Sequence, residues 1–222
     1  MSTIAVLPVK RFDDAKQRLS ETLRGGTRRA LAEAMLTDVL TALRRSKRVE
    51  AVVVVTSEHG ADALARAHDA RTIRDPEEPG HNPAASEGVR WAMDRGARRV
   101  LLVPGDCPAL DPAQLTALLE SVEPAPSVVL VPDRHGTGTN GLVLHPPTAI
   151  EPSFGPGSRE RHTALAQEAG ASLRVEEMPS LVLDVDTPDD LAAMREVLER
   201  SRGGAAHTRG LLRRLARNDE AK

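Results

Sequence analysis

Short apolar runs alternate along the chain with stretches in which apolar side chains recur at the spacing of a helix. The runs at 3–9 and 50–57 are almost unbroken. Runs of this kind are typical of strands that are buried on both faces, as in a parallel sheet. The predicted strands cover 3–9, 50–57, 98–103, 127–134, 140–146 and 172–178, and a further strand ends at Asp186.

Apolar residues four positions apart predict amphipathic helices between these strands. In 27–45, Leu31, Met35, Val39 and Leu43 recur at every fourth position. The other predicted helices cover 60–70, 81–96, 111–121, 158–169 and 188–200.

The alternation of strands and helices predicts one α/β domain with a mostly parallel sheet flanked by helices. We assign this domain to 1–200. The remaining segment, 201–222, has six basic and two acidic residues and opens near a Gly-Gly pair. It is expected either to fray as a disordered tail or to form a peripheral helix.

Composition disfavours several classes of function. Thirty basic residues nearly balance thirty-two acidic ones, and the only aromatic residues are one Trp and two Phe. Nucleic-acid binding usually needs a basic surface or aromatic stacking platforms, so this class is disfavoured. No run approaches the roughly 18 apolar residues of a membrane span, and the single cysteine, Cys107, excludes an intramolecular disulfide. The sequence therefore predicts a cytoplasmic protein with small-molecule partners, without nucleic acid or membrane.

The residues that follow each strand are the informative ones, because ligands of open α/β sheets bind outside the carboxyl ends of the strands. The first strand is not followed by the Gly-x-Gly-x-x-Gly pattern of a dinucleotide site. A basic loop stands there instead, with the cations Lys10, Arg11, Lys16 and Arg18. Such a loop suits a polyphosphate, whose charge must be neutralised during transfer. The alternative is a basic loop that only contacts water.

Two later strands end in carboxylates. Asp106 follows the run at 98–103, and alternation places Asp184 and Asp186 on one side of the run before the last helix. Two carboxylates from distant strand ends can hold Mg²⁺, which also takes substrate phosphates as ligands. Asp186 is favoured as the partner of Asp106 because it stands at the strand end. The alternative, a helix-capping role for these acids, is weakened because Thr187 already fills the cap position.

Five motifs follow one another along the chain: "LPVKRFDDAKQRLS", "VPGDCPALDP", "RHGTGTNGL", "FGPGSRERH" and "LDVDTPDDL". Together they resemble the CofC/FbiD guanylyltransferases of deazaflavin coenzyme F-420 biosynthesis, over Thr3 to Glu199. The Gly-Asp-x-Pro and Asp-x-Asp-Thr-Pro patterns mark only the wider nucleotidyltransferase superfamily. "GTGTNGL" followed by "FGPGS" is more specific. The resemblance implies a Rossmann-like fold of the nucleotide-diphospho-sugar transferase type.

Enzymes of this family join the α-phosphate of GTP to the phosphate of a three-carbon acid and release pyrophosphate. The resemblance implies phosphoenolpyruvate or 2-phospho-L-lactate as that acid, and the Arg- and Ala-rich composition favours the first. It also implies Mg²⁺ as cofactor, bound by Asp106 and Asp186, and contacts from Thr139, Gly155 and Ser158 to the acid. The product is expected to pass to a downstream transferase, and a homodimer is one assembly that the sequence allows.

The residues around Ser158 suit an anionic ligand. Ser158 begins a predicted helix, where its hydroxyl and the free N–H groups form an anion site. Arg159, Arg161 and His162 add charge for a phosphate or carboxylate, or else face solvent.

The nucleoside is expected at the other strand ends. Asn82 is a candidate for contacts to the nucleoside, with a plain helix N-cap as the alternative. Guanine is expected to be read by backbone groups after Thr56 and within 79–88.

The acceptor phosphate is already an anion, so the transfer needs no general base. Alignment and neutralisation by Mg²⁺, Lys10, Lys16 and Arg18 are expected to carry catalysis. Cys107 is then a small buried residue beside Asp106 and not a nucleophile.

Three alternatives stay open. Asp184-Val-Asp186 also matches the Asp-x-Asp motif of glycosyltransferases, which release a nucleoside diphosphate, although in those enzymes the motif lies mid-chain. A second alternative is a related transferase with 3-phosphoglycerate or molybdopterin as acceptor. The third is a regulatory module that binds the nucleotide without chemistry, and would bind GTP without releasing pyrophosphate.

Overall fold

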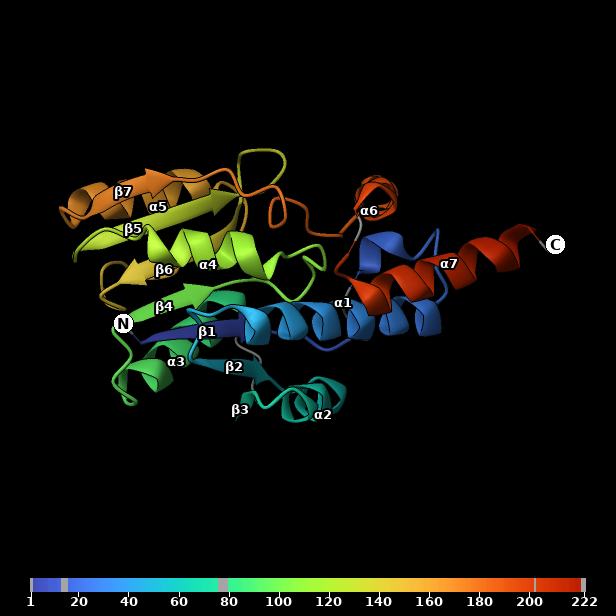
Figure 1. The fold of residues 1–222 in the computed structure, drawn as a ribbon, viewed down its shortest axis with the longest axis horizontal. Coiled ribbons are helices and arrows are strands. Elements are labelled where there is room, and N and C mark those ends of the chain that lie inside the picture. The colour runs from blue at the N-terminus through green and yellow to red at the C-terminus, as the bar shows by residue number, and fades with distance from the viewer. Residues whose placement is uncertain (1, 13–15, 76–79, 202, 221–222) are drawn as a thin grey trace.

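A seven-stranded sheet runs through the molecule in the order β3-β2-β1-β4-β6-β5-β7 (Figure 1). The computed structural model describes residues 2–12, 16–75, 80–201 and 203–220, with the backbone alone for 218–220. The strands are β1 (Thr3–Pro8), β2 (Ala51–Thr56), β3 (Arg71–Arg74), β4 (Arg99–Leu102), β5 (Ser127–Pro132), β6 (Thr139–His145) and β7 (Ser172–Val175).

Most neighbouring strands are parallel. β1 pairs in parallel with β2 and β4, β2 with β3, and β5 with β7. Only β6 is antiparallel to its neighbours, β4 and β5. The loops that follow β1, β4 and β5 therefore meet the start of β6 at one edge of the sheet. The mostly parallel α/β fold predicted from the sequence is confirmed.

Helices cover both faces of the sheet. α1, α2 and α4 pack on one face, and α3 and α5 pack on the other. The helices are α1 (Gly25–Arg45), α2 (His59–Ala67), α3 (His81–Met93), α4 (Pro112–Glu120), α5 (Ser158–Glu168), α6 (Pro188–Arg200) and α7 (Ala206–Glu220), with a 3₁₀ turn at Gln17–Leu19.

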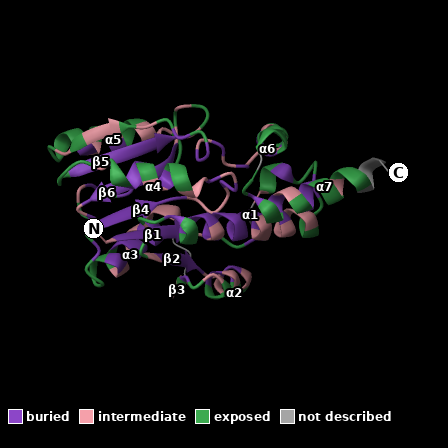
Figure 2. Cartoon of the chain, viewed as in Figure 1, coloured by how far each residue is buried: buried purple, intermediate pink, exposed green. Residues whose placement is uncertain are grey.

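The central strands are buried on both faces (Figure 2). Leu7 of β1 packs into the apolar cluster under α1, whereas Val6 packs into the cluster under α3. α3 approaches β1 so closely that a Cβ atom on Gly88 would lie 2.2 Å from Cγ1 of Val6. Close packing of this kind fixes β1 and hence the starting point of the basic loop that follows it.

Two local predictions need correction. β3 was not expected, because its four residues hold only one aliphatic side chain and it forms one edge of the sheet. The segment that ends at Asp186 was expected to be a strand, but it is irregular. Side chains hold it instead: Asn140 Nδ2 donates to the Leu181 carbonyl at 3.0 Å, and Asp190 Oδ2 accepts from the Asp186 amide at 3.1 Å.

Beyond residue 200 the chain forms a helix, the second of the two expectations for this segment. α7 runs along α1 and extends past the body of the molecule (Figure 1). Leu211 and Leu212 are buried in an apolar cluster with residues of α1 and α6. Asp38 of α1 accepts hydrogen bonds from the amides of His207 and Thr208, at 3.1 and 2.8 Å. A carboxylate at a helix N-terminus is favourable, so Asp38 helps to fix α7.

Candidate functional site

A cleft of about 660 Å³ opens at the edge of the sheet where the loops meet. Its lining comes from the segments after β1 and β4, from the β5–β6 hairpin, from the segments before α5 and α6, and from residues of α1 and α3. Eight of the predicted site residues line it: Lys10, Lys16, Arg18, Asp106, Thr139, Gly155, Ser158 and Asp186.

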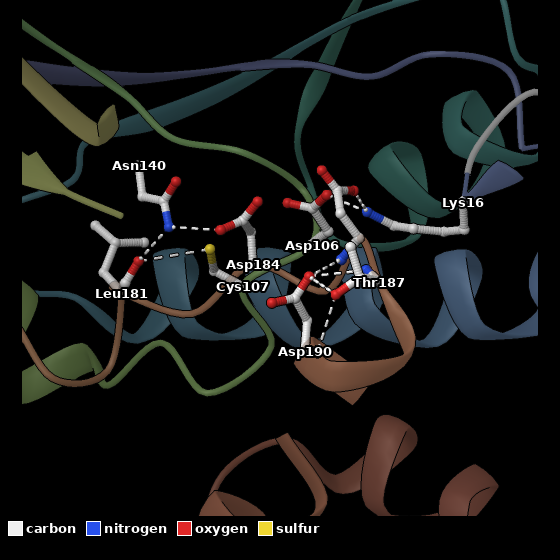
Figure 3. A network of polar contacts seen from close by, with 9 residues as sticks. Lys16, Asp106, Cys107, Asn140, Leu181, Asp184, Thr187 and Asp190 are labelled. Atoms are coloured by element: carbon white, nitrogen blue, oxygen red, sulfur yellow. Dashed lines mark hydrogen bonds and ion pairs between the residues drawn. The ribbon is translucent and has the colours of Figure 1, made fainter. Parts of the chain in front are cut away.

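Lys16 and two carboxylates form the charged end of the cleft (Figure 3). The Lys16 ammonium donates to Asp106 Oδ2 and, at 2.8 Å, to Asp186 Oδ1. Burial opposes the charge of Lys16, but the two carboxylates raise its pKa above the usual value. Lys16 also has a backbone φ of 61°, in the left-handed region that residues other than glycine seldom adopt. The ammonium is therefore held in place as a cation shared by both acids.

The remaining oxygen of Asp106, Oδ1, is buried and has no hydrogen-bond partner among the described residues. An unpaired buried carboxylate oxygen is costly unless a cation approaches it. The described residues contain no group of three or more His, Cys, Asp or Glu side chains placed to hold a metal. Two carboxylates, one of them with an unpartnered oxygen, fit a hard cation that completes its shell with water or phosphate oxygens.

Asp184 lies near Asp106 and Asp186. The sequence favoured Asp186 over Asp184 as the second metal ligand. Burial and the neighbouring charge of Asp106 raise the pKa of Asp184 to about 6, and a hydrogen bond from Asn140 opposes this shift. Cys107 is fully buried, and burial raises the pKa of its thiol. Its Sγ donates to the Leu181 carbonyl at 3.6 Å, which agrees with a packing role (Figure 3).

Thr187 caps α6 as predicted, and together with Asp190 it forms a capping box. The Asp190 amide donates to Thr187 Oγ1, and Asp190 Oδ2 accepts from the Thr187 amide at 2.7 Å. Asp190 Oδ1 also forms an ion pair with Arg134 of the β5–β6 hairpin at 2.7 Å. These contacts fix the position of Asp186, the residue before the cap.

A second group of lining residues, which we call the neutral end of the cleft, contains the hydroxyls of Thr139 and Ser158, with the buried imidazole of His162 behind them. Thr139, at the start of β6, has its Oγ1 3.3 Å from Ser158 Oγ and 3.0 Å from His162 Nδ1. The other ring nitrogen, Nε2, accepts from the Ser153 amide at 2.9 Å. Burial, with a smaller effect of Arg161, lowers the pKa of His162 to about 4. His162 is therefore neutral, which corrects the expectation that it adds charge for a ligand.

The N-terminus of α5 is also less open than predicted. The Ser158 amide donates to Gly155 O at 3.0 Å, and the Arg159 amide donates to Thr137 O at 3.1 Å. These two N–H groups are not free to bind an anion. Gly155 and Gly157 have φ values of 112° and 70°, so the turn that brings the chain into the cleft requires glycine.

Asn82 and Arg159 do not line the cleft, but they form hydrogen bonds to segments that do. Asn82 Nδ2 donates to Phe154 O at 3.2 Å, and Asn82 Oδ1 accepts from the Phe154 amide at 2.6 Å. The N-cap alternative for Asn82 is wrong, since Gly80 precedes the first helical residue. Arg159 Nη1 donates to the Gly136 carbonyl at 3.0 Å and so fixes the β5–β6 hairpin.

His81 lines the cleft beside the basic loop and was missed in the sequence, where nothing separates it from other helix-start residues. Burial, and then the charge of Lys10, lower its pKa. Its ring packs edge-on against Phe154, with a centroid distance of 5.0 Å. Phe154 packs in the same way against His162 at a centroid distance of 5.1 Å. The ring of Phe154 therefore connects His81 at the start of α3 with His162 of α5.

A smaller cavity of about 290 Å³ opens after β2, where the sequence places guanine-reading groups near Thr56. Glu58 in its lining accepts hydrogen bonds from the Phe12 amide at 3.1 Å and from Arg29 at 2.9 Å. Glu58 thus ties the basic loop to α1. Within 79–88, residue 79 lies outside the described residues.

Comparison with known proteins agrees with the geometry. The family model described as "Guanylyl transferase CofC like" matches residues 3–220. The chain belongs to this family. The match includes α7, which corrects the interpretation that the family pattern ends near residue 199. No helix in the described part of this family member is long and apolar enough to cross a membrane.

Two curated relatives share one name, phosphoenolpyruvate guanylyltransferase. A protein of Conexibacter woesei named phosphoenolpyruvate guanylyltransferase is 56% identical over 220 residues, which cover 99% of each chain. A protein of Sphaerobacter thermophilus with that name is 40% identical over 195 residues, covering 86% of this chain and 91% of the relative. This CofC-family chain is a nucleotidyltransferase.

Solved structures show the same fold at low sequence identity. A protein from Desulfovibrio desulfuricans described as a candidate nucleotide-diphospho-sugar transferase superposes with a TM-score of 0.76 at 17% identity, over 96% of this chain and 95% of that one. The CMP:2-keto-3-deoxy-manno-octonic acid synthetase bound to CTP superposes with a TM-score of 0.61 at 14% identity, over 90% and 99%. The Rossmann-like fold of this type, predicted from the motifs, is confirmed.

Proposed function

We propose that the chain is a guanylyltransferase that joins GTP to phosphoenolpyruvate and releases pyrophosphate. The observation that carries this proposal is that two groups of residues line one cleft: an ammonium shared by two carboxylates, and a pair of uncharged hydroxyls. The first suits a triphosphate with its metal ion, and the second suits a small acid. The names of the two relatives support guanylyl transfer to phosphoenolpyruvate.

At the charged end, Asp106 and Asp186 would hold a divalent cation, which we take to be Mg²⁺. The pairing of both acids with one ammonium, and the unpartnered Oδ1 of Asp106, support this assignment. When bound, such an ion supplies charge neutralisation and orientation of phosphate oxygens. Lys10, Lys16 and Arg18 line the same cleft and would bind the phosphates of GTP.

At the neutral end, Thr139, Gly155 and Ser158 would contact the acceptor acid. Thr139 lines the cleft and carries a hydrogen-bonding hydroxyl, and Gly155 lets the backbone approach the ligand without a side chain. Asn82 and Arg159 would act on the site indirectly, by holding Phe154 and the β5–β6 hairpin.

The chemical step is an in-line displacement. An oxygen of the acceptor phosphate forms a bond to the α-phosphorus of GTP, and the bond from that phosphorus to the oxygen bridging the α- and β-phosphates breaks. The electron pair leaves with pyrophosphate. Because the attacking oxygen is already an anion, no proton has to be removed, and no side chain is needed as a general base.

The test is pyrophosphate release by the purified protein with Mg²⁺. GTP, ATP and CTP would each be paired with phosphoenolpyruvate, 2-phospho-L-lactate and 3-phosphoglycerate. Release that requires GTP and phosphoenolpyruvate is the expected result. Preference for another acid would reassign the acceptor, whereas GTP binding without pyrophosphate release from any pair would refute catalysis and favour a regulatory module.

A role in coenzyme F-420 biosynthesis, transfer of the product to a downstream enzyme, assembly as a homodimer and a cytoplasmic location remain predictions of the sequence. The first two follow from the proposed product, a phosphoric anhydride that is activated for transfer of its acid-bearing phosphate. Coupled turnover with the downstream transferase would test them.

A further inference from the structure

His162 is fully buried in α5 and uses both of its ring nitrogens. Nε2 lies 2.9 Å from the Ser153 amide nitrogen, and Nδ1 lies 3.0 Å from Thr139 Oγ1. A backbone amide can only donate, so Nε2 must be the unprotonated nitrogen of the neutral ring. The proton then resides on Nδ1, and Nδ1 donates to the Thr139 hydroxyl.

The Thr139 hydroxyl has a second donor beside it. Ser158 Oγ lies 3.3 Å from Thr139 Oγ1, in a geometry that makes serine the donor. The Thr139 oxygen thus accepts from both His162 and Ser158, and a hydroxyl that accepts twice has its own proton left to donate. Thr139 lines the cleft, which is where a bound ligand could accept that proton.

We propose that His162 is a positioning residue, which directs the hydroxyl proton of Thr139 into the cleft. Thr139 then serves as a donor to an anionic oxygen of the acceptor, a carboxylate or phosphate oxygen. This inference rests on the proposed function, in which the acceptor binds at this end of the cleft. It replaces a cationic role for His162 with an uncharged one.

The loop around Ser153 does not depend on His162 alone. Arg161 donates to Ser153 Oγ at 3.1 Å, to Ser153 O at 3.0 Å and to Phe154 O at 3.2 Å. Asn82 adds two hydrogen bonds to the Phe154 backbone. The bond from Ser153 to Nε2 is therefore one of several that hold this loop, whereas Nδ1 is the nitrogen that bonds the Thr139 hydroxyl.

Two amide substitutions separate the two hydrogen bonds of the ring. In His162→Gln, the side-chain amide oxygen can reach the place of Nε2 and accept from Ser153, but the donor to Thr139 is lost. In His162→Asn, the amide nitrogen can reach the place of Nδ1 and donate to Thr139, but the acceptor for Ser153 is lost. Positioning therefore predicts a larger effect for Gln, and a loop-holding role predicts a larger effect for Asn.

The measurement is steady-state pyrophosphate release with each substrate varied in turn, alongside thermal unfolding. Expected for His162→Gln is a rise of about tenfold in KM for phosphoenolpyruvate, with KM for GTP unchanged, since one orienting hydrogen bond to the donor is lost. His162→Asn is expected to stay within about threefold of wild type. Equal effects of the two substitutions, or a larger one for Asn, would overturn the inference.

A double-variant cycle with Thr139→Val completes the test. If His162 acts through Thr139, His162→Gln should have no further effect on KM for the acceptor once the hydroxyl is gone. Additive effects would show that His162 acts by another route and would overturn the inference. A wild-type protein that releases no pyrophosphate would refute the proposed function instead, so the two failures are distinguishable.

Discussion

The two ends of the cleft are organised in different ways. At one end, Lys16, Asp106 and Asp186 are held by charge, and half of the Asp186 side chain remains exposed. At the other end, Thr139 and His162 are buried and uncharged, and they are held by hydrogen bonds of fixed direction.

We therefore expect the ion pairs at the charged end to rearrange when substrate binds, and the hydrogen bonds at the neutral end to stay as they are. At the charged end, the Lys16 ammonium neutralises the acids that a cation would otherwise neutralise, so substrate binding must redistribute these contacts. At the neutral end, the donor direction is already fixed. Losses at the charged end should therefore lower kcat, where charge moves in the transition state. Losses at the neutral end should raise KM for the acceptor.

Asp106→Asn should have the largest effect. The substitution removes the negative charge that pairs with the Lys16 ammonium. That charge also lies on the buried Oδ1, which lacks a hydrogen-bond partner among the described residues. We expect kcat for pyrophosphate release to fall about 10³-fold, with the fold intact by circular dichroism. The matched control is Glu120→Gln, on an exposed acid of α4 that pairs with Arg48 outside the cleft. Retention of more than a tenth of the wild-type kcat would contradict the assignment of Asp106.

Lys16→Met should follow, with a fall in kcat of about 10²-fold, because a cation facing the polyphosphate is lost. In the absence of nucleotide, the same variant should bind Mn²⁺ or Mg²⁺ several-fold more tightly than wild type. The reason is that Asp106 and Asp186 lose the ammonium that neutralises them. Calorimetric titration would measure this, with the exposed Lys47→Met as control. Unchanged or weaker cation binding would show that Lys16 is not their counter-ion.

Thr139→Val should raise KM for phosphoenolpyruvate by about 10- to 30-fold and leave KM for GTP unchanged, because a donor to an anionic oxygen is removed. Thr139→Ser keeps the hydroxyl and should lie much closer to wild type. Initial rates with each substrate varied would measure the split. A rise in KM for GTP of the same size would show that the two ends do not divide the substrates.

The smallest effect expected is the contribution of His162 to the pH dependence of stability. Burial lowers the pKa of His162 from 6.5 to about 4. Between these values the unfolded chain binds a proton that the folded protein does not, so the free energy of unfolding falls as pH decreases. The contribution amounts to about 3 kcal/mol at most. Urea unfolding at several pH values should show a shallower decline in His162→Asn, and an identical decline would contradict a buried neutral imidazole.

Much of the fold was predictable, because apolar runs and helical spacing are local signals. They located six of the strands and the central helices, and Thr187 in the cap position indicated the start of α6. β3 was not predicted because an exposed edge strand needs few apolar residues. The segment before Asp186 looked like a strand because its alternation is real, but side-chain contacts from Asn140 replace sheet pairing there.

In the candidate site, residue types after strands predicted which side chains meet, but not what each one does. Lys16 could be placed in a basic loop, whereas its pairing with acids 90 and 170 positions away depends on tertiary structure. His162 looked like one cation among three. Its neutrality follows from burial and from the partners of its two nitrogens, which no local pattern encodes.

The central claim is that an acceptor phosphate held at the neutral end attacks the α-phosphorus of GTP held at the charged end. Phosphoenolpyruvate labelled with ¹⁸O in its phosphate group, turned over with unlabelled GTP, tests this most directly by mass spectrometry of the products. The account predicts that all of the label appears in the guanosine-linked acid and none in pyrophosphate. Label in pyrophosphate, or GDP as the nucleotide product, would contradict it.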